Sequence, residues 1–508
     1  MTSSFTLLDA AVLLVYLVGT TALGMWLGRH QKDARDYFVA GRAIPWWAIL
    51  FSVVATETSA LTFISIPGLA YIADLSFLQV ALGYLVGRIV IGYTLLPRYY
   101  QGELVTAYAL LEQRFGTSTR RFASIIFMVT RAFGDSVRVF ATAIPIALII
   151  GPVIAPQYLT PVSILILGAF TIVYTYHGGM RAVVWTDVLQ TIVYLLGGFA
   201  AIWLLGRGVD GGWSAILSGA DSAGKLRVFD AYTGFDRPHT IWAGVIGGAF
   251  LSMASHGADQ LIVQRLLASS SLRDARRSLI GSGVAVILQF ILFLMIGIGL
   301  FAYYRGQTFQ RPDEIFPRFI VEVMPPGLTG LVIAAILAAA MSTVSGSLNS
   351  LSAATTHDIY LPITGRRADD PGVLRIGKVF TLMWAVVLIG GALLYRAQGT
   401  PVVVVALSVA SFTYGGLLGG FFLGMLWRRA IQRDAILGMA VGIAAMTLVV
   451  FARPLSAAYP ALANSLGPLG RIAWPWYVLI GTSITMLVGV LSSLTHPVPA
   501  ERTAKAPA

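Results

Sequence analysis

Long apolar stretches run through the whole chain, and they constrain its fold more than any other feature. A helix needs about 20 apolar residues to cross the hydrocarbon core of a bilayer. The sequence predicts thirteen such spans, at 8–29, 46–73, 76–97, 122–150, 157–177, 182–206, 240–267, 275–304, 327–360, 374–396, 401–427, 431–452 and 474–494. Only 11% of the 508 residues are charged, against about 25% in soluble domains. A soluble enzyme, a nucleic-acid-binding protein and a disordered chain are therefore excluded, and we predict an all-α polytopic membrane protein.

The basic residues predict how these spans are oriented. An odd number of spans places the two termini on opposite sides of the membrane. With the N-terminus outside, the inner segments carry about twice as many Lys and Arg residues as the outer ones, as the positive-inside rule requires. The first span has no basic region before it, so we expect a membrane helix rather than a signal peptide. We predict a multi-pass protein of the cell membrane, with one transmembrane domain at 1–494 and a short cytoplasmic tail at 495–508.

The span at 46–73 is polar in its middle. It contains Thr56, Glu57, Thr58, Ser59 and Thr62, followed by Pro67 and Gly68. A helix that unwinds here frees backbone carbonyl groups, which can bind a cation where they line a protected cavity. The alternative is a kinked helix whose hydroxyl groups bond to its own backbone.

The span at 327–360 carries a second polar face. Ala339, Ser342 and Thr343 are spaced i, i+3, i+4, which places them on one side of a helix. Their hydroxyl and carbonyl oxygens are hard ligands, which suit alkali cations better than transition metals. The alternative is close helix packing through small residues.

Charged residues inside spans are expensive and indicate function by default. Asp135 and Arg138 are spaced i, i+3 and are expected to neutralise each other. Asp259 lies near a span end, and we expect it to cap a helix or to pair with Arg265. A lone histidine such as His256 is more often a packing residue than a ligand.

Several kinds of chemistry are excluded by what the sequence lacks. It contains no cysteine, so disulfides and thiolate sites are impossible. Residues 219–225 have the spacing of a P-loop, but Leu226 stands where Ser or Thr is required, and no HExxH pattern occurs. These observations argue against an ATP-driven pump and a zinc protease.

Four ordered stretches resemble the sodium/solute symporter family, which includes the sodium–glucose, sodium–proline, sialic acid and iodide cotransporters. They are 174–190, 55–68, 259–265 and 349–360. The resemblance implies a LeuT-like fold, with two inverted five-helix repeats and substrate and ion sites at discontinuous helices. It divides the chain into a first helix and loop at 1–45, repeats at 46–206 and 240–427, and two C-terminal helices at 431–494.

The resemblance also implies the ligands of the coupling ion. The family's sodium site falls on the main-chain carbonyls of Ala55 and Thr58 and on the oxygens of Ala339, Ser342 and Thr343. Members with a second sodium ion add residues that match Asp187 and Ser345. Gly346 does not supply the hydroxyl group that some of those members have, so the second site is incomplete.

The solute side departs from the sugar symporters, because Val286 and Leu407 stand where those proteins carry Lys and Gln. Glu57 resembles the Asp of proline-type members, which favours an amine-bearing substrate, unless Glu57 pairs with an arginine such as Arg138. The expected substrate contacts are Glu57, Ser59, Thr62, Ser252, His256 and Ser408.

These features predict sodium-coupled secondary active symport of a small polar organic solute by alternating access. Na⁺ is the coupling ion and no organic cofactor is expected. The expected partners are the solute and the lipid bilayer, with no nucleic acid and no obligatory protein partner. The alternatives are a membrane sensor with a transporter-like fold and a proton-coupled transporter that uses Glu57 or His256. An integral-membrane enzyme is a weaker alternative, because no clustered acid/base or metal constellation is found.

Overall fold

The computed structural model describes residues 5–29, 31, 33–102, 104–150, 154–309, 311–370, 372–395 and 402–497. In these ranges the chain is helical, and its only bridge between extended segments joins Ile44 to Ser269. The long helices are α1 (Leu7–Leu27), α5 (Leu78–Tyr93), α8 (Thr117–Ile150), α9 (Pro156–Gly208), α13 (Leu272–Tyr303), α15 (Leu328–Ala354), α17 (Val373–Leu394), α18 (Val402–Leu426), α19 (Gln432–Ala458) and α21 (Trp476–Ser493). The shorter helices are α2 (Ala34–Val39), α3 (Trp46–Glu57), α4 (Ala60–Ile72), α6 (Leu96–Tyr99), α7 (Ala109–Phe115), α10 (Gly212–Ser222), α11 (Gly248–Gly257), α12 (Gln260–Leu267), α14 (Ile315–Val323), α16 (Leu361–Thr364) and α20 (Ala463–Leu466).

Seven described helices are long and apolar enough to cross a membrane, and the pair α3 and α4 makes an eighth candidate. The 53-residue α9 covers two of the predicted spans. A straight helix of that length would measure about 80 Å, far more than one crossing needs. It bends at Gly179, whose φ of 53° and ψ of −153° are not helical. The predicted number of thirteen spans is compatible with these elements and stays a prediction.

Two spans are broken in the middle. The predicted interruption of 46–73 is confirmed, because α3 ends at Glu57, α4 starts at Ala60, and the two are bent by 63°. The second break, at Ala258 and Asp259 between α11 and α12, was not predicted from the sequence. Asp259 caps α12 by accepting the N–H of Leu261 at 2.8 Å.

Helix α15 lies in the centre of the bundle, and nearly all its residues are buried. It packs against α9, α1, α8 and α17, and also against both halves of the broken pair α3 and α4. Its many Ala, Gly and Ser side chains allow such close neighbours. The close packing considered for 327–360 is therefore present together with the polar face.

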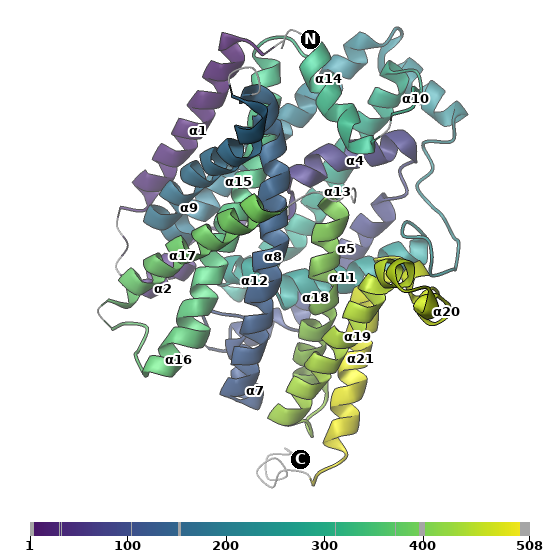
Figure 1. The fold of residues 1–508 in the computed structure, drawn as a ribbon. Coiled ribbons are helices and arrows are strands. Elements are labelled where there is room, and N and C mark those ends of the chain that lie inside the picture. Colours follow the sequence, from purple (N-terminus) through teal and green to yellow (C-terminus); the bar gives the residue numbers. More distant parts are fainter. Residues whose placement is uncertain are drawn as a thin grey trace.

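The loops separate into two groups at opposite ends of the bundle. Helices α10 and α14 lie at the end where α1 begins, whereas α2, α7 and α16 lie toward the end where α21 finishes (Figure 1). The kink of α9 belongs to the second group, since Arg181 lies 3.7 Å from Asp36 of α2. The segments richest in Lys and Arg thus gather at one end, as the predicted topology requires.

Candidate cation and solute site

The break between α3 and α4 exposes backbone groups that a continuous helix would hide. Thr58 and Ser59 are extended, and the Ser59 hydroxyl accepts the N–H of Thr62 at 3.3 Å as the cap of α4. A helix end leaves its last four carbonyl groups without intrahelical donors. The carbonyls of Ala55 and Thr58, two of the predicted sodium ligands, therefore lie where oxygen atoms are free to bind a cation.

The other predicted ligands lie on α15, which packs against α3 and α4. Ala339, Ser342 and Thr343 are buried. The Thr343 hydroxyl donates to the Ala339 carbonyl at 3.2 Å. These oxygens thus share one face of α15, as their spacing predicts.

Asp187 of α9 joins the two halves of this arrangement. One carboxylate oxygen accepts the hydroxyl of Ser52 on α3 at 2.5 Å, and the other accepts the hydroxyl of Ser342 on α15 at 2.7 Å. Ser52 lies one turn before Ala55 on α3. Asp187 is fully buried, so this carboxylate fixes the distance between the helices that carry the predicted ligands.

Asp187 also has a cationic partner. Arg265 of α12 lies 3.1 Å from its carboxylate and donates to the Ser52 hydroxyl at 2.9 Å. Of the two roles expected for Asp259, the helix cap is present and the pairing with Arg265 is wrong, because six residues along α12 turn Arg265 to another side of the helix, where it meets Asp187, while Asp259 meets Arg131. Gly346 makes room for the guanidinium, since a Cβ at this position would lie 2.5 Å from Arg265 Nη2. The Ser345 hydroxyl donates to the Ser342 carbonyl at 3.1 Å.

Glu57, at the last turn of α3, forms an ion pair with Arg88 of α5. Arg88 is completely buried and also donates to the Ser282 hydroxyl at 2.7 Å. The alternative in which Glu57 pairs with an arginine is therefore confirmed. The arginine named for it, Arg138, was wrong, because Arg138 pairs with Asp135 at 3.1 Å as its i, i+3 spacing predicts.

Three of the predicted substrate contacts come together around this ion pair. Nε2 of His256 lies 3.8 Å from Glu57 and has no other partner within the described part of the chain. The Ser252 hydroxyl lies 3.5 Å from Nδ1 of His256 and donates to the Tyr84 carbonyl. Ser59 and Thr62 lie at the start of α4, and the side chain of Ser408 lies outside the described residues.

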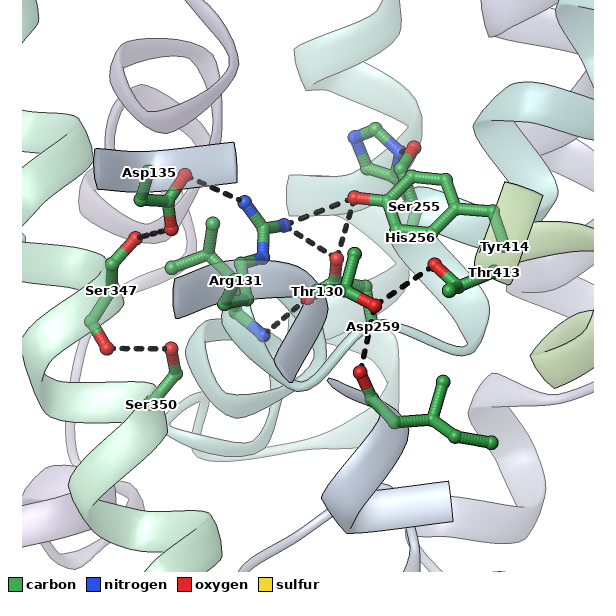
Figure 2. Close-up of polar contacts among 12 residues, drawn as sticks. Thr130, Arg131, Asp135, Ser255, His256, Asp259, Ser347, Ser350, Thr413 and Tyr414 are labelled. Carbon is green, nitrogen blue, oxygen red and sulfur yellow. Dashed lines mark hydrogen bonds and ion pairs between the residues drawn. The ribbon is translucent and has the colours of Figure 1, made fainter. Parts of the chain in front are cut away.

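A second buried network surrounds the break between α11 and α12. Figure 2 shows Arg131 of α8 between the carboxylate of Asp135 and the hydroxyl of Tyr414. Arg131 also pairs with Asp259 at 2.5 Å, and Tyr414 donates to the same carboxylate oxygen at 2.6 Å. Asp135 in turn accepts the hydroxyl of Ser347 on α15 at 2.5 Å. The network therefore ties α8, α12, α15 and α18 together.

The sequence did not reveal several of these partners. Gln289 of α13 bonds both the Thr58 hydroxyl and the Tyr194 hydroxyl, at 2.7 and 3.0 Å. Arg265 lies near the end of the predicted span 240–267, and its side chain is completely buried beside Asp187. Arg88 lies inside the predicted span 76–97, and its pairing with Glu57 was not expected. The only indication of these ion pairs in the sequence was that charges of both signs occur within the predicted spans.

The sequence profile of the sodium:solute symporter family matches residues 37–442. The chain belongs to this family. The sodium/sialic acid symporter NanT of Aliivibrio fischeri is 31% identical over 96% of this chain and 94% of its own length. The human sodium/iodide cotransporter is 28% identical over 86% of this chain and 68% of its own length. The protein is therefore a sodium-coupled solute symporter that works by alternating access, and not an enzyme.

Solved structures agree with this membership. A substrate-bound, outward-open sodium-coupled sialic acid symporter, in which a novel sodium site was found, superimposes with a TM-score of 0.84 at 29% identity. The match covers 97% of this chain and 99% of the other. The nucleobase-cation-symport-1 transporter Mhp1 superimposes with a TM-score of 0.55 at 16% identity, which shows a shared fold alone.

Proposed function

We propose that this symporter binds its coupling sodium ion between the α3–α4 break and α15. The ligands are the carbonyl oxygens of Ala55, Thr58 and Ala339 and the hydroxyl oxygens of Ser342 and Thr343. The observation that carries this proposal is that the Asp187 carboxylate accepts hydrogen bonds from both Ser52 on α3 and Ser342 on α15. These bonds set the spacing between the two halves of the site. The Ser342 hydroxyl gives its proton to Asp187, so its lone pairs remain available to the ion.

We further propose that one sodium ion is bound. Asp187 and Ser345, which match the second sodium site of some family members, are engaged inside the protein. The guanidinium of Arg265 lies beside Asp187 and supplies the positive charge that a second ion would bring. Gly346 provides the space for this guanidinium and no hydroxyl group for an ion.

Sodium binding at this position couples to the conformational cycle. An ion that bridges α3, α4 and α15 stabilises the arrangement in which these helices are close, and a ligand shifts an equilibrium only through its different affinities for the two states. We propose that sodium enters first from outside and that the solute completes the site. Inward movement of one sodium ion then contributes about 2.3 kcal/mol per 100 mV of membrane potential.

We propose a small carboxylate-bearing solute. Arg88 already balances the negative charge of Glu57. The site therefore does not need the amine-bearing substrate that Glu57 favoured when the sequence was considered alone. Ser59 caps the Thr62 N–H, but the N–H groups before it at the start of α4 lack intrahelical partners, and such helix starts attract anions. Relatives include symporters of sialic acid and monocarboxylate transporters, whose substrates carry a carboxylate. The predicted contacts are Glu57, Ser59, Thr62, Ser252, His256 and Ser408.

The topology is proposed to follow the charge bias. We assign the N-terminus to the outer side and the end that holds α2, α7 and α16 to the cytoplasm of the cell. The thirteen spans are proposed to comprise inverted five-helix repeats at 46–206 and 240–427, preceded by 1–45 and followed by 431–494. The two broken spans, each the first of its proposed repeat, support this division.

The sodium count and the solute class are tested on the purified full-length protein. Saturation binding of ²²Na⁺ is expected to give one ion per chain in the wild type. N-acetylneuraminate, lactate, proline and glucose are then compared as ligands in sodium and in choline chloride. Sodium-dependent stabilisation is expected from N-acetylneuraminate and lactate, which carry a carboxylate without an ammonium group, and not from zwitterionic proline or uncharged glucose. Two bound ions in the wild type would contradict the role given to Arg265.

A further inference from the structure

A groove at the basic end of the molecule lies between the start of α3, the end of α5 and the start of α13. Its volume is about 480 Å³, and it is lined by Trp46, Tyr93, Arg273, Arg276, Arg277, Ile280 and Gly281. The three arginines are spaced i, i+3, i+4, so they share one face of α13. This groove plays no part in the proposed sodium and solute sites.

The arginines give the groove a net positive charge. Nε of Arg276 donates to the Gly92 carbonyl at 2.9 Å, and its guanidinium lies 4.4 Å from the centre of the Tyr93 ring. Asp274, the acid on the same turn, accepts the hydroxyl of Ser271 at 2.9 Å and lies 3.9 Å from Arg277. One acid does not balance three arginines, and the start of α13 adds the positive end of a 32-residue helix.

Apolar surface continues from the groove along both helices. On α13, Val284, Leu288 and Ile291 follow Arg277 at i+7, i+11 and i+14, and all three are exposed on the outside of the protein. On α5, exposed apolar side chains recur over 86–93. Trp46 and Tyr93 are also exposed, as aromatic residues at a membrane–water boundary commonly are. The groove thus joins a cationic rim to two lipid-facing stripes.

We propose that this groove is a binding site for an anionic phospholipid. The phosphate lies among the three arginines, and the acyl chains follow the exposed stripes of α5 and α13. Basic pockets between membrane helices are suited to such headgroups. The groove connects the starts of α3 and α13, and these helices carry Ala55 and the Thr58 partner Gln289. A lipid bound here therefore holds together α3 and α13, the two helices that lie beside the α3–α4 break.

The test measures lipid binding to the purified full-length protein by native mass spectrometry and by thermal stability in detergent. The probes are phosphatidylglycerol, phosphatidylcholine and free glycerol 3-phosphate. The variant Arg273→Gln/Arg276→Gln/Arg277→Gln is compared with a control of equal charge loss at the same end, Arg366→Gln/Arg367→Gln/Arg375→Gln. The single variant Arg277→Gln tests the site with the least disturbance of folding.

We expect phosphatidylglycerol to bind the wild type and the control, and the triple variant to bind it on the order of 100-fold more weakly. Arg277→Gln is expected to show a smaller loss of the same kind. Equal binding of phosphatidylglycerol by the triple variant and the control would overturn the proposal. Equal stabilisation by phosphatidylcholine would show an apolar groove only, and equal stabilisation by glycerol 3-phosphate would show a site for free anions. Either result would overturn it too.

Discussion

The Glu57–Arg88 ion pair makes a quantitative prediction about stability. Breaking a buried pair by removing one partner costs about 3–5 kcal/mol. The Glu57 side chain is 21% exposed, so we expect Glu57→Gln to lower the free energy of unfolding by about 3 kcal/mol, at the low end of that range. This variant leaves Arg88 charged and completely buried, and a guanidinium cannot release its proton. Arg88→Met should cost less, about 1–2 kcal/mol, because the Glu57 carboxylate that remains is partly exposed, whereas Arg88 is completely buried.

Reversible unfolding of the purified protein in sodium dodecyl sulfate measures these free energies. The double variant Glu57→Gln/Arg88→Met is expected to be more stable than the sum of the single losses predicts. Glu322→Gln is the matched control, since its pair with Arg318 is exposed at the surface and should be worth less than about 1 kcal/mol. Wild-type stability of Glu57→Gln, together with lost solute binding, would refute this reasoning and return Glu57 to a direct role in binding.

Three further changes test other parts of the structure. Tyr414→Phe removes hydrogen bonds to Asp259 and Arg131 and should lower the free energy of unfolding by about 1.5–3 kcal/mol, measured as above. Gly179→Ala should lower the free energy of unfolding by about 1–3 kcal/mol, because the backbone conformation there is essentially reserved for glycine and the new Cβ would lie 2.5 Å from the Tyr37 carbonyl oxygen. Gly219→Ala is the control, since Gly219 has open space around it. The Pro497 carbonyl and the Asp434 carboxylate raise the pKa of the half-buried His496. That stabilisation is complete below the ordinary pKa of about 6.5 and is lost as pH rises through the raised value, so His496→Ala should remove the fall in stability that the wild type shows as pH rises above about 6.5.

Local sequence patterns predicted the parts of the site that depend on neighbouring residues. The polar middle of 46–73 predicted the break, since hydroxyl and carboxyl groups at membrane depth compete with the helical backbone. The i, i+3 spacing of Asp135 and Arg138 predicted their pairing, because helix geometry alone brings them together. The face formed by Ala339, Ser342 and Thr343 follows from the same geometry.

Partners that are distant in the sequence could not be predicted this way. Glu57 and Arg88 are 31 residues apart, Asp187 and Arg265 are 78 apart, and Arg131 and Asp259 are 128 apart. Spacing fixes which side of a helix a charge occupies, whereas the packing of several helices decides which opposite charge it meets. The break at Ala258 has no proline beside it. Ser255, His256 and Gly257 precede it and the capping residue Asp259 follows it, but such residues also occur within continuous membrane helices.

Sodium binding by Thr343→Ala tests the central claim most directly. This change removes one proposed ligand without adding bulk, and Ser350→Ala removes a buried hydroxyl from the same helix outside the site. Loss of a hydroxyl ligand worth about 1–3 kcal/mol should raise the sodium concentration for half-saturation in ²²Na⁺ binding by roughly 5- to 150-fold. The control should match the wild type. An unchanged sodium affinity in Thr343→Ala would contradict a sodium site between the α3–α4 break and α15.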